Sequence, residues 1–564
     1  MGKIFVDPVD GTDCELLTLE ELRPKHEGNK NVLLQTIVSG SSEVEHYATN
    51  IIYKCAGCKR SKHFDYKDIE PNVSDWRDIP NTFKCDVCNI QMYQSQVNKD
   101  QLRKILMTEQ GTKNPIHLIG YIYGEDINKI EPGTKLNIRG ILKSRKNNSK
   151  DLTYKRFFDI TQFSKTDDKI VPPTPQEIED FKNMDKTLLI RSFAPQIRNM
   201  YLIKEALLLA CIGGYEKDGI RGDINILLLG DPGVAKTQLL KFVTKIVRKS
   251  DYISGKSASG AGLFGGVDNL SDNTRIGKPG SVTLCNGGVA ALDEMEKMNS
   301  ADRVYCHEVM ESQTFSLRKI GIDITWEVKV AIIGAANPKK SVWNPELTIN
   351  ENVNLPASLL SRFGLIFLIR DKPNKDEDLA IAEHIAKVRR GELEKILEPQ
   401  TITKFITYAK TLKPVEDEQC GETLTQWWSS LRLEEQREGS ISVDIRTLED
   451  LHRIAEAYAR LHLSETVTRE HANMAIKMLK ESLQTLGMNT PGEKNASITE
   501  SMNKNEYIAY IFKQGPLTHA QAITKLREKY KWFSTDEKAH EQIVKLKSIG
   551  LISESGDKLI WVSQ

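Results

Sequence analysis

Several features that define whole classes of protein are scarce or missing in this chain of 564 residues. Its charges nearly cancel, because 78 Lys and Arg stand against 77 Asp and Glu, for a net charge of +1. No apolar run reaches the roughly 18–20 residues of a membrane span, and the first residues carry no apolar segment of a secretion signal. We therefore expect no membrane partner and no secretion signal, and any polyanion must be met by local basic patches.

The composition also excludes the collagenous, mucin-like and wholly disordered classes of protein. Hydrophobic residues make up 39% of the chain and charged residues 27%, with 36 Gly and 20 Pro, which is typical of globular domains. At about 150 residues per domain, this length predicts roughly three to four domains. A division of labour between domains is therefore expected.

Cysteine is scarce as well, and five of the nine cysteines are isolated, which indicates a reducing environment rather than a disulfide framework. The other four form two Cys-x-x-Cys pairs, Cys55, Cys58, Cys85 and Cys88. Two such pairs typically hold Zn²⁺, although a redox pair or chance are alternatives and the gap between the pairs exceeds the usual spacing of about 15–20 residues. Four protein ligands leave no open position, so we predict a structural zinc site with His63 outside it.

Residues 30–165 form short apolar or alternating segments separated by turn signals. A small antiparallel barrel of the OB type, with the cysteine pairs inserted between strands, fits this pattern, and so does another small β domain. Cations gather around one expected hairpin, at Lys143, Arg145, Lys146, Lys150, Lys155 and Arg156. On charge alone, this hairpin either contacts nucleic-acid phosphates or is a solvated tip.

From about residue 180 the pattern changes to helices alternating with short apolar strands, at 224–229, 289–292 and 330–335. Continuous apolar strands are typical of a parallel sheet covered on both faces, so we predict an α/β core. Residues 400–485 contain no clear strand, and the tail from 501 contains three helices and a hairpin, as in a winged helix. The expected boundaries are a barrel with the zinc insertion at 1–165, a linker at 166–180, a core at 181–395, a helical lid at 396–486, a linker at 487–500 and a winged helix at 501–564.

A phosphate-binding loop follows the strand at 224–229. It consists of Gly230, Asp231, Pro232, Gly233, Val234, Ala235, Lys236, Thr237 and Gln238, and a helix continues from it. Backbone N–H groups at such a helix N-terminus converge on a phosphate. Lys236 would reach the β and γ phosphates and the Thr237 hydroxyl would bind Mg²⁺. The alternative, a glycine turn without a ligand, explains the flanking strand and helix less well.

Polar side chains follow the next two apolar strands. Asp293 suits the Mg²⁺ shell, and Glu294 suits a base that deprotonates the attacking water. Asn337, at the end of the following strand, could hold that water or the γ-phosphate. Arg362 and Arg446 are candidates to stabilise charge on the transferred phosphoryl group, although position alone does not separate them from surface arginines.

These motifs resemble the minichromosome maintenance (MCM) family of replicative helicases, which are AAA+ ATPases. The resemblance rests on six segments in family order, 189–195, 221–238, 292–298, 307–311, 336–338 and 360–363. It covers about residues 185–485, and more loosely the cysteine pairs and the region 132–156. It implies an AAA+ core with a helical lid, in an archaeal-type single-subunit form.

The resemblance implies an ATP-dependent DNA helicase that works in replication with 3′ to 5′ polarity, with ATP, Mg²⁺ and Zn²⁺ as cofactors. Arg362 looks like the arginine finger and Arg446 like the sensor-2 arginine, both reaching a neighbour's nucleotide in a homo-hexamer. Lys319 matches a hairpin lysine that projects into the channel, and the cationic hairpin with Lys143 looks like a second DNA contact. Single- and double-stranded DNA, a loader and accessory proteins are the implied partners, in the cytoplasm at the nucleoid or in a nucleus. The alternative is a DNA-binding loading factor in which ATP only sets the conformation.

The sequence also departs from the family pattern. Gly364 replaces the usual Asp after Ser-Arg-Phe, which predicts a looser placement of Arg362, and residues 262–266 are altered in the helix-2 insert. Trp326 is expected as a packed hairpin aromatic rather than a residue that stacks on a base. The short start predicts that the family's N-terminal helical subdomain is missing or reduced.

Overall fold

The computed structural model divides the chain into two compact units, Met1–Leu486 and Gly487–Gln564, which are described separately. The residues that the structure describes are 4–6, 13–19, 21–27, 32–65, 83–108, 117–146, 154–165, 173–217, 219–256, 259–269, 275–319, 322–340, 342–344, 347–371, 374–392, 397–434, 443–488, 508, 512, 517–527, 536–548, 552–555 and 558–561.

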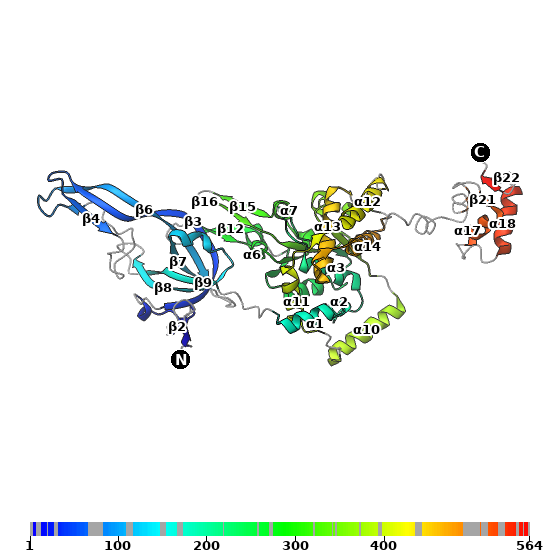
Figure 1. Ribbon diagram of the computed structural model, residues 1–564, viewed down its shortest axis with the longest axis horizontal. Helices are drawn as coiled ribbons and strands as arrows, with labels where there is room; N and C mark the ends of the chain where they lie inside the picture. The colour runs from blue at the N-terminus through cyan, green and yellow to red at the C-terminus, as the bar shows by residue number, and fades with distance from the viewer. Residues whose placement is uncertain are drawn as a thin grey trace. The chain divides into compact units, whose positions relative to one another are not determined.

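The first unit begins with a strand-rich part, coloured blue to cyan in Figure 1. Its main strands are β3 (Val32–Cys55), β6 (Gln91–Thr108), β7 (His117–Tyr123), β8 (Lys135–Lys146) and β9 (Tyr154–Lys165), with β1 (Ile4–Val6) and β2 (Asp13–Leu17) at one edge. The pairings run β3-β8-β9-β7-β6, and β6 pairs with β3 again, so the path closes. Apolar side chains fill its inside, among them Leu34, Ile105 and Phe158.

Two of these strands continue far beyond the closed part. β3 and β6 stay paired as far as Cys55 opposite Met92. There they carry β4 (Ser61–Asp65) and β5 (Phe83–Lys84), and a small separate core containing Ile51, Tyr53 and Met92 stabilises this end. The two cysteine pairs therefore lie at the end of a long hairpin, whose length the sequence pattern did not predict.

The second part of this unit contains a parallel sheet in the order β11-β14-β17-β10-β18, as the apolar runs predicted. The strands are β10 (Ile226–Gly230), β11 (Ser250–Ser254), β14 (Val289–Asp293), β17 (Ala331–Ala336) and β18 (Leu365–Ile369). Three of them consist entirely of buried residues in a run of four or more apolar side chains, because helices cover both faces. The surrounding helices are α1 (Pro175–Asn183), α2 (Thr187–Ser192), α3 (Tyr201–Ile212), α4 (Lys236–Ile246), α7 (Ser300–Ser312) and α10 (Lys375–Arg390).

Two hairpins project from this core, β12 (Gly265–Asn269) with β13 (Arg275–Pro279), and β15 (Thr314–Lys319) with β16 (Ile322–Glu327). Trp326 is 8% exposed and stacks on Phe315 at a centroid distance of 6.0 Å, so the prediction of a packed aromatic is confirmed. Both hairpins also contact β3. Gly277 pairs with Ser41, and the Asp323 N–H donates to Glu43 at 2.9 Å.

The region from 400 to 485 is helical as predicted, with α11 (Pro399–Thr411), α12 (Glu418–Glu434), α13 (Ile445–Leu461) and α14 (Arg469–Thr485). The sequence showed no clear strand here, and the structure adds only a short parallel pair, β19 (Val415–Glu416) with β20 (Thr466–Val467). These two-residue strands are too short to leave an apolar pattern. α14 packs on the parallel sheet, where the Ser482 hydroxyl accepts from the Ile366 N–H and donates to the Ile366 carbonyl oxygen.

The second unit contains α17 (His519–Arg527), α18 (Asp536–Ser548) and a three-stranded sheet in the order β21-β23-β22. The strands are β21 (Leu517–Thr518), β22 (Ile552–Ser555) and β23 (Lys558–Trp561), and they share a small apolar core with both helices. Most of the first helix predicted here, at 504–513, lies outside the described residues. No helix in the described part of either unit is long and apolar enough to cross a membrane.

Candidate nucleotide-binding site and metal centre

The phosphate-binding loop joins β10 to α4, as the sequence predicted. Ala235 takes a left-handed backbone conformation with φ 60°, and at Gly233 the space around the missing side chain is open. The buried Lys236 ammonium donates to the carbonyl oxygens of Gly230 at 2.7 Å and Asp231 at 2.8 Å. These two carbonyl oxygens carry no formal charge. Phosphate oxygens bind an ammonium more strongly and can therefore replace them when a nucleotide binds.

Asp231 fixes this loop to its surroundings. Its two carboxylate oxygens accept from the backbone N–H groups of Trp343 and Asp371, both at 3.1 Å. These donors follow β17 and β18, which pair with β10 on either side. The loop is therefore held between the ends of three adjacent strands.

Asp293, at the end of β14, lies directly beside Thr237. Its Oδ2 atom accepts from the Thr237 hydroxyl at 2.6 Å and from the Tyr252 hydroxyl at 2.8 Å. A hydroxyl and a carboxylate oxygen this close fit Mg²⁺, which prefers hard oxygen ligands. Burial and Asp293 raise the pKa of Tyr252 to about 12, so it remains a donor at neutral pH.

Glu294 follows Asp293 in a left-handed conformation with φ 54°, which costs energy outside glycine and is typical of functional sites. Its carboxylate accepts from the Ser254 hydroxyl at 3.2 Å and forms an ion pair with Lys297. Lys297 holds the pKa of this carboxyl below its usual range. Asn337 lies at the end of β17, where its amide donates to Glu296 at 3.0 Å.

The two candidate arginines meet at one carboxylate in α7. Arg362 lies 2.7 Å from Glu311 Oε2, and Arg446 lies 3.9 Å from Glu311 Oε1. Arg362 also donates to His307 at 3.2 Å, and Arg446 pairs with Asp444 at 3.4 Å. Among the described residues, neither arginine has a hydrogen bond or ion pair with the phosphate-binding loop.

Three contributors to this geometry had no predicted role. Tyr252 and Glu296 contact the polar strand ends, and Glu311 holds the arginines. The position of Tyr252 follows from the β11–β14 register, which sequence does not fix. The four-residue spacing of His307 and Glu311 places both on one face of α7 and could have indicated a shared partner.

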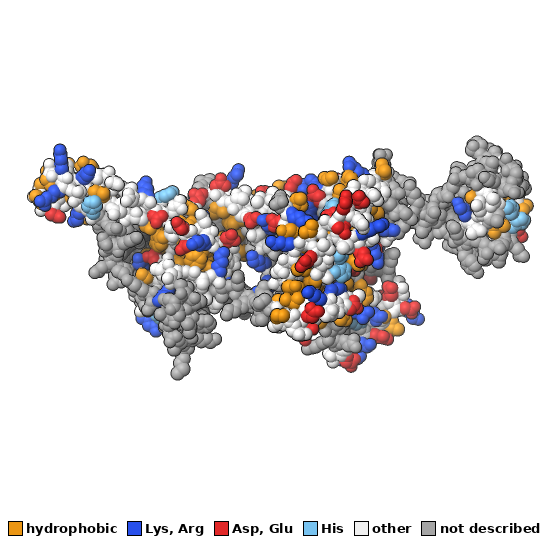
Figure 2. Space-filling model, in the orientation of Figure 1, with side chains coloured by type: hydrophobic (Ala, Val, Ile, Leu, Met, Phe, Trp, Pro, Cys, Tyr) orange, Lys and Arg blue, Asp and Glu red, His pale blue; other side chains and the backbone are white. Residues whose placement is uncertain are grey.

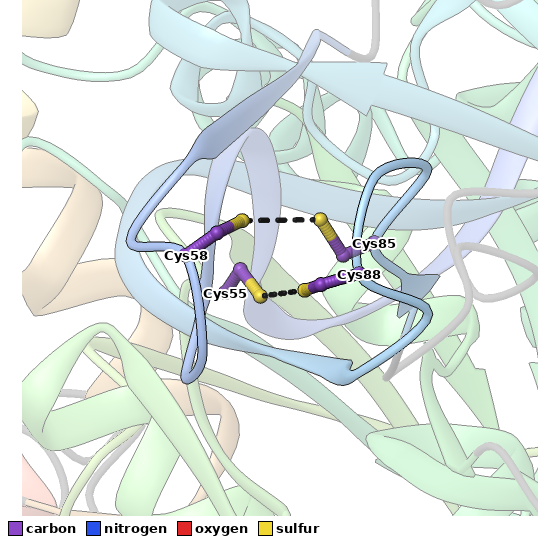
Figure 3. A group of neighbouring side chains, drawn as sticks. All are labelled: Cys55, Cys58, Cys85 and Cys88. Atoms are coloured by element: carbon purple, nitrogen blue, oxygen red, sulfur yellow. Dashed lines mark hydrogen bonds between the residues drawn. The ribbon is translucent and has the colours of Figure 1, made fainter.

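The four paired cysteines come together as predicted (Figure 3). All their sulfur atoms lie within 4.8 Å of one another, with Cys55 and Cys88 3.2 Å apart and Cys58 and Cys85 3.4 Å apart. Four thiolates about 2.3 Å from a tetrahedral Zn²⁺ lie roughly 3.8 Å apart. The cluster therefore fits zinc with little rearrangement, and His63 is exposed in β4 and is not a member of it.

The cations expected to contact DNA are placed differently from one another. Lys143 is mostly buried and pairs with Asp159 at 2.5 Å, whereas Lys319 is exposed at the end of β15. The backbones of Arg145 and Lys146 continue β8, and their side chains lie outside the described residues. On the face shown in Figure 2, cationic and anionic side chains are interspersed, in keeping with the net charge of +1.

Comparison with known families identifies two segments of the chain. A family model described as the MCM P-loop domain matches residues 175–389, and one described as the MCM AAA-lid domain matches residues 400–483. Together they cover the parallel sheet, the phosphate-binding loop and the helices that follow.

Individual relatives give the same result. The chain is 33% identical over 390 residues to the DNA replication licensing factor mcm7 of Xenopus tropicalis, covering 65% of this chain and 54% of the relative. It is 34% identical over 388 residues to the minichromosome maintenance protein MCM of Saccharolobus solfataricus, covering 65% and 56%. It is 32% identical over 507 residues to the DNA replication licensing factor MCM7 of Arabidopsis thaliana, covering 82% and 69%. The chain thus spans little more than half the length of the first two relatives.

Proposed function

Because the chain belongs to the minichromosome maintenance family of P-loop ATPases, we propose that it is an ATP-dependent DNA helicase that unwinds duplex DNA in replication as a hexameric ring. The observation that carries this proposal is the split arrangement of its candidate catalytic groups. Thr237 and Asp293 lie 2.6 Å apart at the phosphate-binding loop, while Arg362 and Arg446 meet at Glu311 without contacting that loop in the described residues. A complete site then needs two subunits.

Within one subunit, each residue has a role that its position permits. Lys236 binds the β and γ phosphates, and Thr237 and Asp293 hold Mg²⁺, which neutralises phosphate charge when bound. Glu294 takes the proton of the attacking water, and Asn337 orients that water or the γ-phosphate. The lowered pKa of Glu294 keeps it ionised, as a base must be.

The neighbouring subunit supplies Arg362 and Arg446 to the transferred phosphoryl group. Both are held by Glu311 here, and a γ-phosphate with more negative charge can replace that carboxylate. Since one chain carries both halves of the site, the proposed ring is a homo-hexamer. Assembly with other chains of the family is the alternative that mass measurement of the purified complex decides.

The remaining parts are proposed to contact DNA. The closed path of strand pairings supports an OB-type barrel at 1–165 with a structural Zn²⁺, and the small α/β unit supports a winged helix at 501–564. Lys319 and the hairpin with Lys143, Arg145 and Lys146 are the proposed DNA contacts in the channel, although Lys143 must first leave Asp159 to reach a phosphate. The proposed direction of translocation is 3′ to 5′. Along the chain, the proposed linkers are 166–180 and 487–500, the proposed core is 181–395 and the proposed lid is 396–486. α1 begins within the first of these linkers, at Pro175, where the P-loop family match also starts. A loader and accessory proteins complete the proposed partners, at the nucleoid or in a nucleus.

The proposal is tested with purified protein, ATP and a forked DNA duplex. We expect DNA-stimulated ATP hydrolysis and strand separation, both lost in Lys236→Ala, which serves as the control for contaminating ATPases. Glu294→Gln should bind ATP and lose strand separation. If Glu294→Gln retains full function, or if the wild type hydrolyses ATP but never opens the fork, ATP only sets the conformation of a loading factor.

A further inference from the structure

Gly364, in the loop that carries Arg362, packs directly against the carboxyl group of Asp450 in the lid helix α13. Gly364 follows Arg362 and Phe363 and precedes β18. A Cβ atom at this position would lie 2.7 Å from Cγ of Asp450 and 2.9 and 3.0 Å from its two oxygens. The Asp450 carboxyl therefore occupies the space that the side chain of any other residue at 364 would need.

The loop cannot easily retreat from this contact. The backbone carbonyl oxygen of Asn225, a residue that is 3% exposed, accepts from the Gly364 N–H at 3.0 Å, and the Asn225 side-chain amide donates to the Arg362 carbonyl oxygen at 3.3 Å. Its side-chain oxygen also accepts from Ile332 at 2.8 Å, which ties it to the start of β17. The loop is thus fixed by Asn225, and at Gly364 it meets Asp450.

Asp450 has charged partners as well as this steric one. It accepts from Arg453 at 2.5 Å, and Arg453, also buried, donates to the Arg221 carbonyl oxygen at 2.9 Å and to Glu449 at 2.7 Å. Arg221 in turn donates to the carbonyl oxygen of Met310, the residue before Glu311 in α7. A continuous set of polar contacts therefore runs from the lid to the helix that holds both arginines.

The position of Asp450 on α13 gives this contact a consequence. Asp450 lies four residues after Arg446, so both project from the same face of the helix. Packing of Asp450 on Gly364 therefore fixes the distance between the helix that carries Arg446 and the loop that carries Arg362. In this arrangement both arginines lie near Glu311.

We propose that Asp450 is a positioning residue, which supplies from the lid helix the carboxylate that this chain lacks at 364 and so presents Arg362 and Arg446 as one unit. The proposal rests on the proposed function, because the unit acts on a neighbour's nucleotide. It also answers the expectation that Gly364 loosens Arg362. In this structure Arg362 is 7% exposed and is held by Glu311 and His307, while the Asp450 carboxyl occupies the space beside Gly364.

The test moves the carboxylate back to the loop. Asp450→Ala should lower kcat for ATP hydrolysis between about tenfold and hundredfold, the effect of misplacing a catalytic group by about 1 Å, with KM for ATP little changed. Gly364→Asp alone should also be impaired, because two carboxyls would share one space. The double variant Gly364→Asp/Asp450→Ala should recover most of the lost rate, since the loop now carries the carboxylate.

Two further variants separate positioning from folding. Asp450→Asn keeps the shape but removes the charge beside the buried Arg453. We expect a reduced kcat at a temperature where the variant is still folded, with a melting temperature no lower than that of Asp450→Ala. Glu449→Gln, which removes the neighbouring partner of Arg453, is the matched control and should leave kcat near the wild-type value. Wild-type kcat in Asp450→Asn, or a double variant that melts like the wild type without recovering, would overturn the proposal. Absence of ATP hydrolysis in the wild type itself would remove the proposed function, and with it this inference.

Discussion

The side chain of Glu294, the candidate base of the nucleotide-binding site, is positioned by two neighbouring residues. Its candidate role as a base follows from its place after Asp293, but its two partners, Ser254 and Lys297, come from β11 and from the turn that follows β14. The ion pair with Lys297 is the main cause of its lowered pKa. A carboxylate with a lowered pKa stays ionised to lower pH, so the pH below which Glu294 can no longer act as a base depends on Lys297.

We therefore predict the effect of Lys297→Met on the pH dependence of ATP hydrolysis. Loss of the ammonium raises the pKa of Glu294 toward its ordinary value, so protonation begins at higher pH. The acid limb of the kcat/KM profile should move to higher pH, while the rate at pH 8 changes little. Lys297→Arg, which keeps the charge, should retain the wild-type profile, and an unmoved limb in Lys297→Met would show that Glu294 is not the group that titrates.

At this scale, sequence spacing predicts some contacts and misses others. Thr237 and Asp293 were expected to lie together, and they do, because parallel strands end at the same edge of the sheet. Tyr252 and Glu311 were missed, since their contacts depend on strand register and on the placement of α7. The catalytic roles of all these residues remain predictions.

At the scale of elements, the far end of the long β3–β6 hairpin is stabilised by its own small core and by the cysteine turns that it carries. Each cysteine turn has the same backbone pattern, in which the residue after the second cysteine, Lys59 or Asn89, is left-handed and donates back to the first cysteine.

Backbone N–H groups of Cys88 and Val87 lower the pKa of Cys85 to about 6. The Arg60 N–H lowers the pKa of Cys58, but hydrogen bonds with the other sulfurs, chiefly that of Cys85, and desolvation together outweigh it and raise this pKa to about 11. One proton therefore stays between the Cys58 and Cys85 sulfurs until a metal displaces it. In the described part of the chain, a small apolar core with Ile51, Tyr53 and Met92 lies beside the sulfur cluster.

Removal of the metal should therefore loosen this end and leave the ATPase core intact. We predict that the purified protein contains zinc and that Cys58→Ser lowers the zinc content sharply. Structural zinc contributes roughly 10–16 kcal/mol in small zinc modules, so hydrogen exchange should rise at 51–65 and 83–97 and not in β10 or β14. His63→Ala is the control, because His63 lies outside the cluster, and it should keep its zinc. Unchanged zinc in Cys58→Ser would refute the four-cysteine site.

The elements differ in how far the sequence predicts them. β10, β14 and β17 are visible as apolar runs because both faces of the sheet are covered. The pairing of β13 with β3 is not visible, since it joins residues more than two hundred positions apart through the backbone alone. Gly40 permits this approach, because a Cβ on Gly40 would lie 2.7 Å from the Gly277 carbonyl oxygen.

For the whole molecule, the near-zero net charge excluded little. Lys143 is neutralised by Asp159 and Lys319 is exposed, so the availability of a cation depends on its partners and not on the total. A ring can also enclose DNA and then needs few contacts. The sequence of one chain does not specify whether a neighbouring subunit completes the site. That is the main question, because among the described residues Arg362 and Arg446 pair with Glu311 and not with the phosphate-binding loop.

Mixing two inactive variants tests whether sites are shared. Arg362→Ala keeps the ATP-binding side, and loss of an arginine finger costs about 10³–10⁵ in kcat. Lys236→Ala keeps the arginines but lacks ATP binding. In rings formed from equal amounts, about one quarter of the sites combine an intact ATP-binding side with an intact neighbour, because the interface is head-to-tail. ATPase activity should recover to about a quarter of the wild-type rate.

The matched control mixes Lys236→Ala with Glu294→Gln. Both changes lie on the ATP-binding side, so no combination of these subunits contains an intact site, and this mixture should stay inactive. Recovery in the first mixture and not in the second requires that Arg362 acts across a subunit boundary. If both mixtures stay inactive although mass measurement detects mixed rings, Arg362 acts within its own subunit. The pairing with Glu311 would then be part of a site completed inside one chain, and the ring would not be needed for hydrolysis.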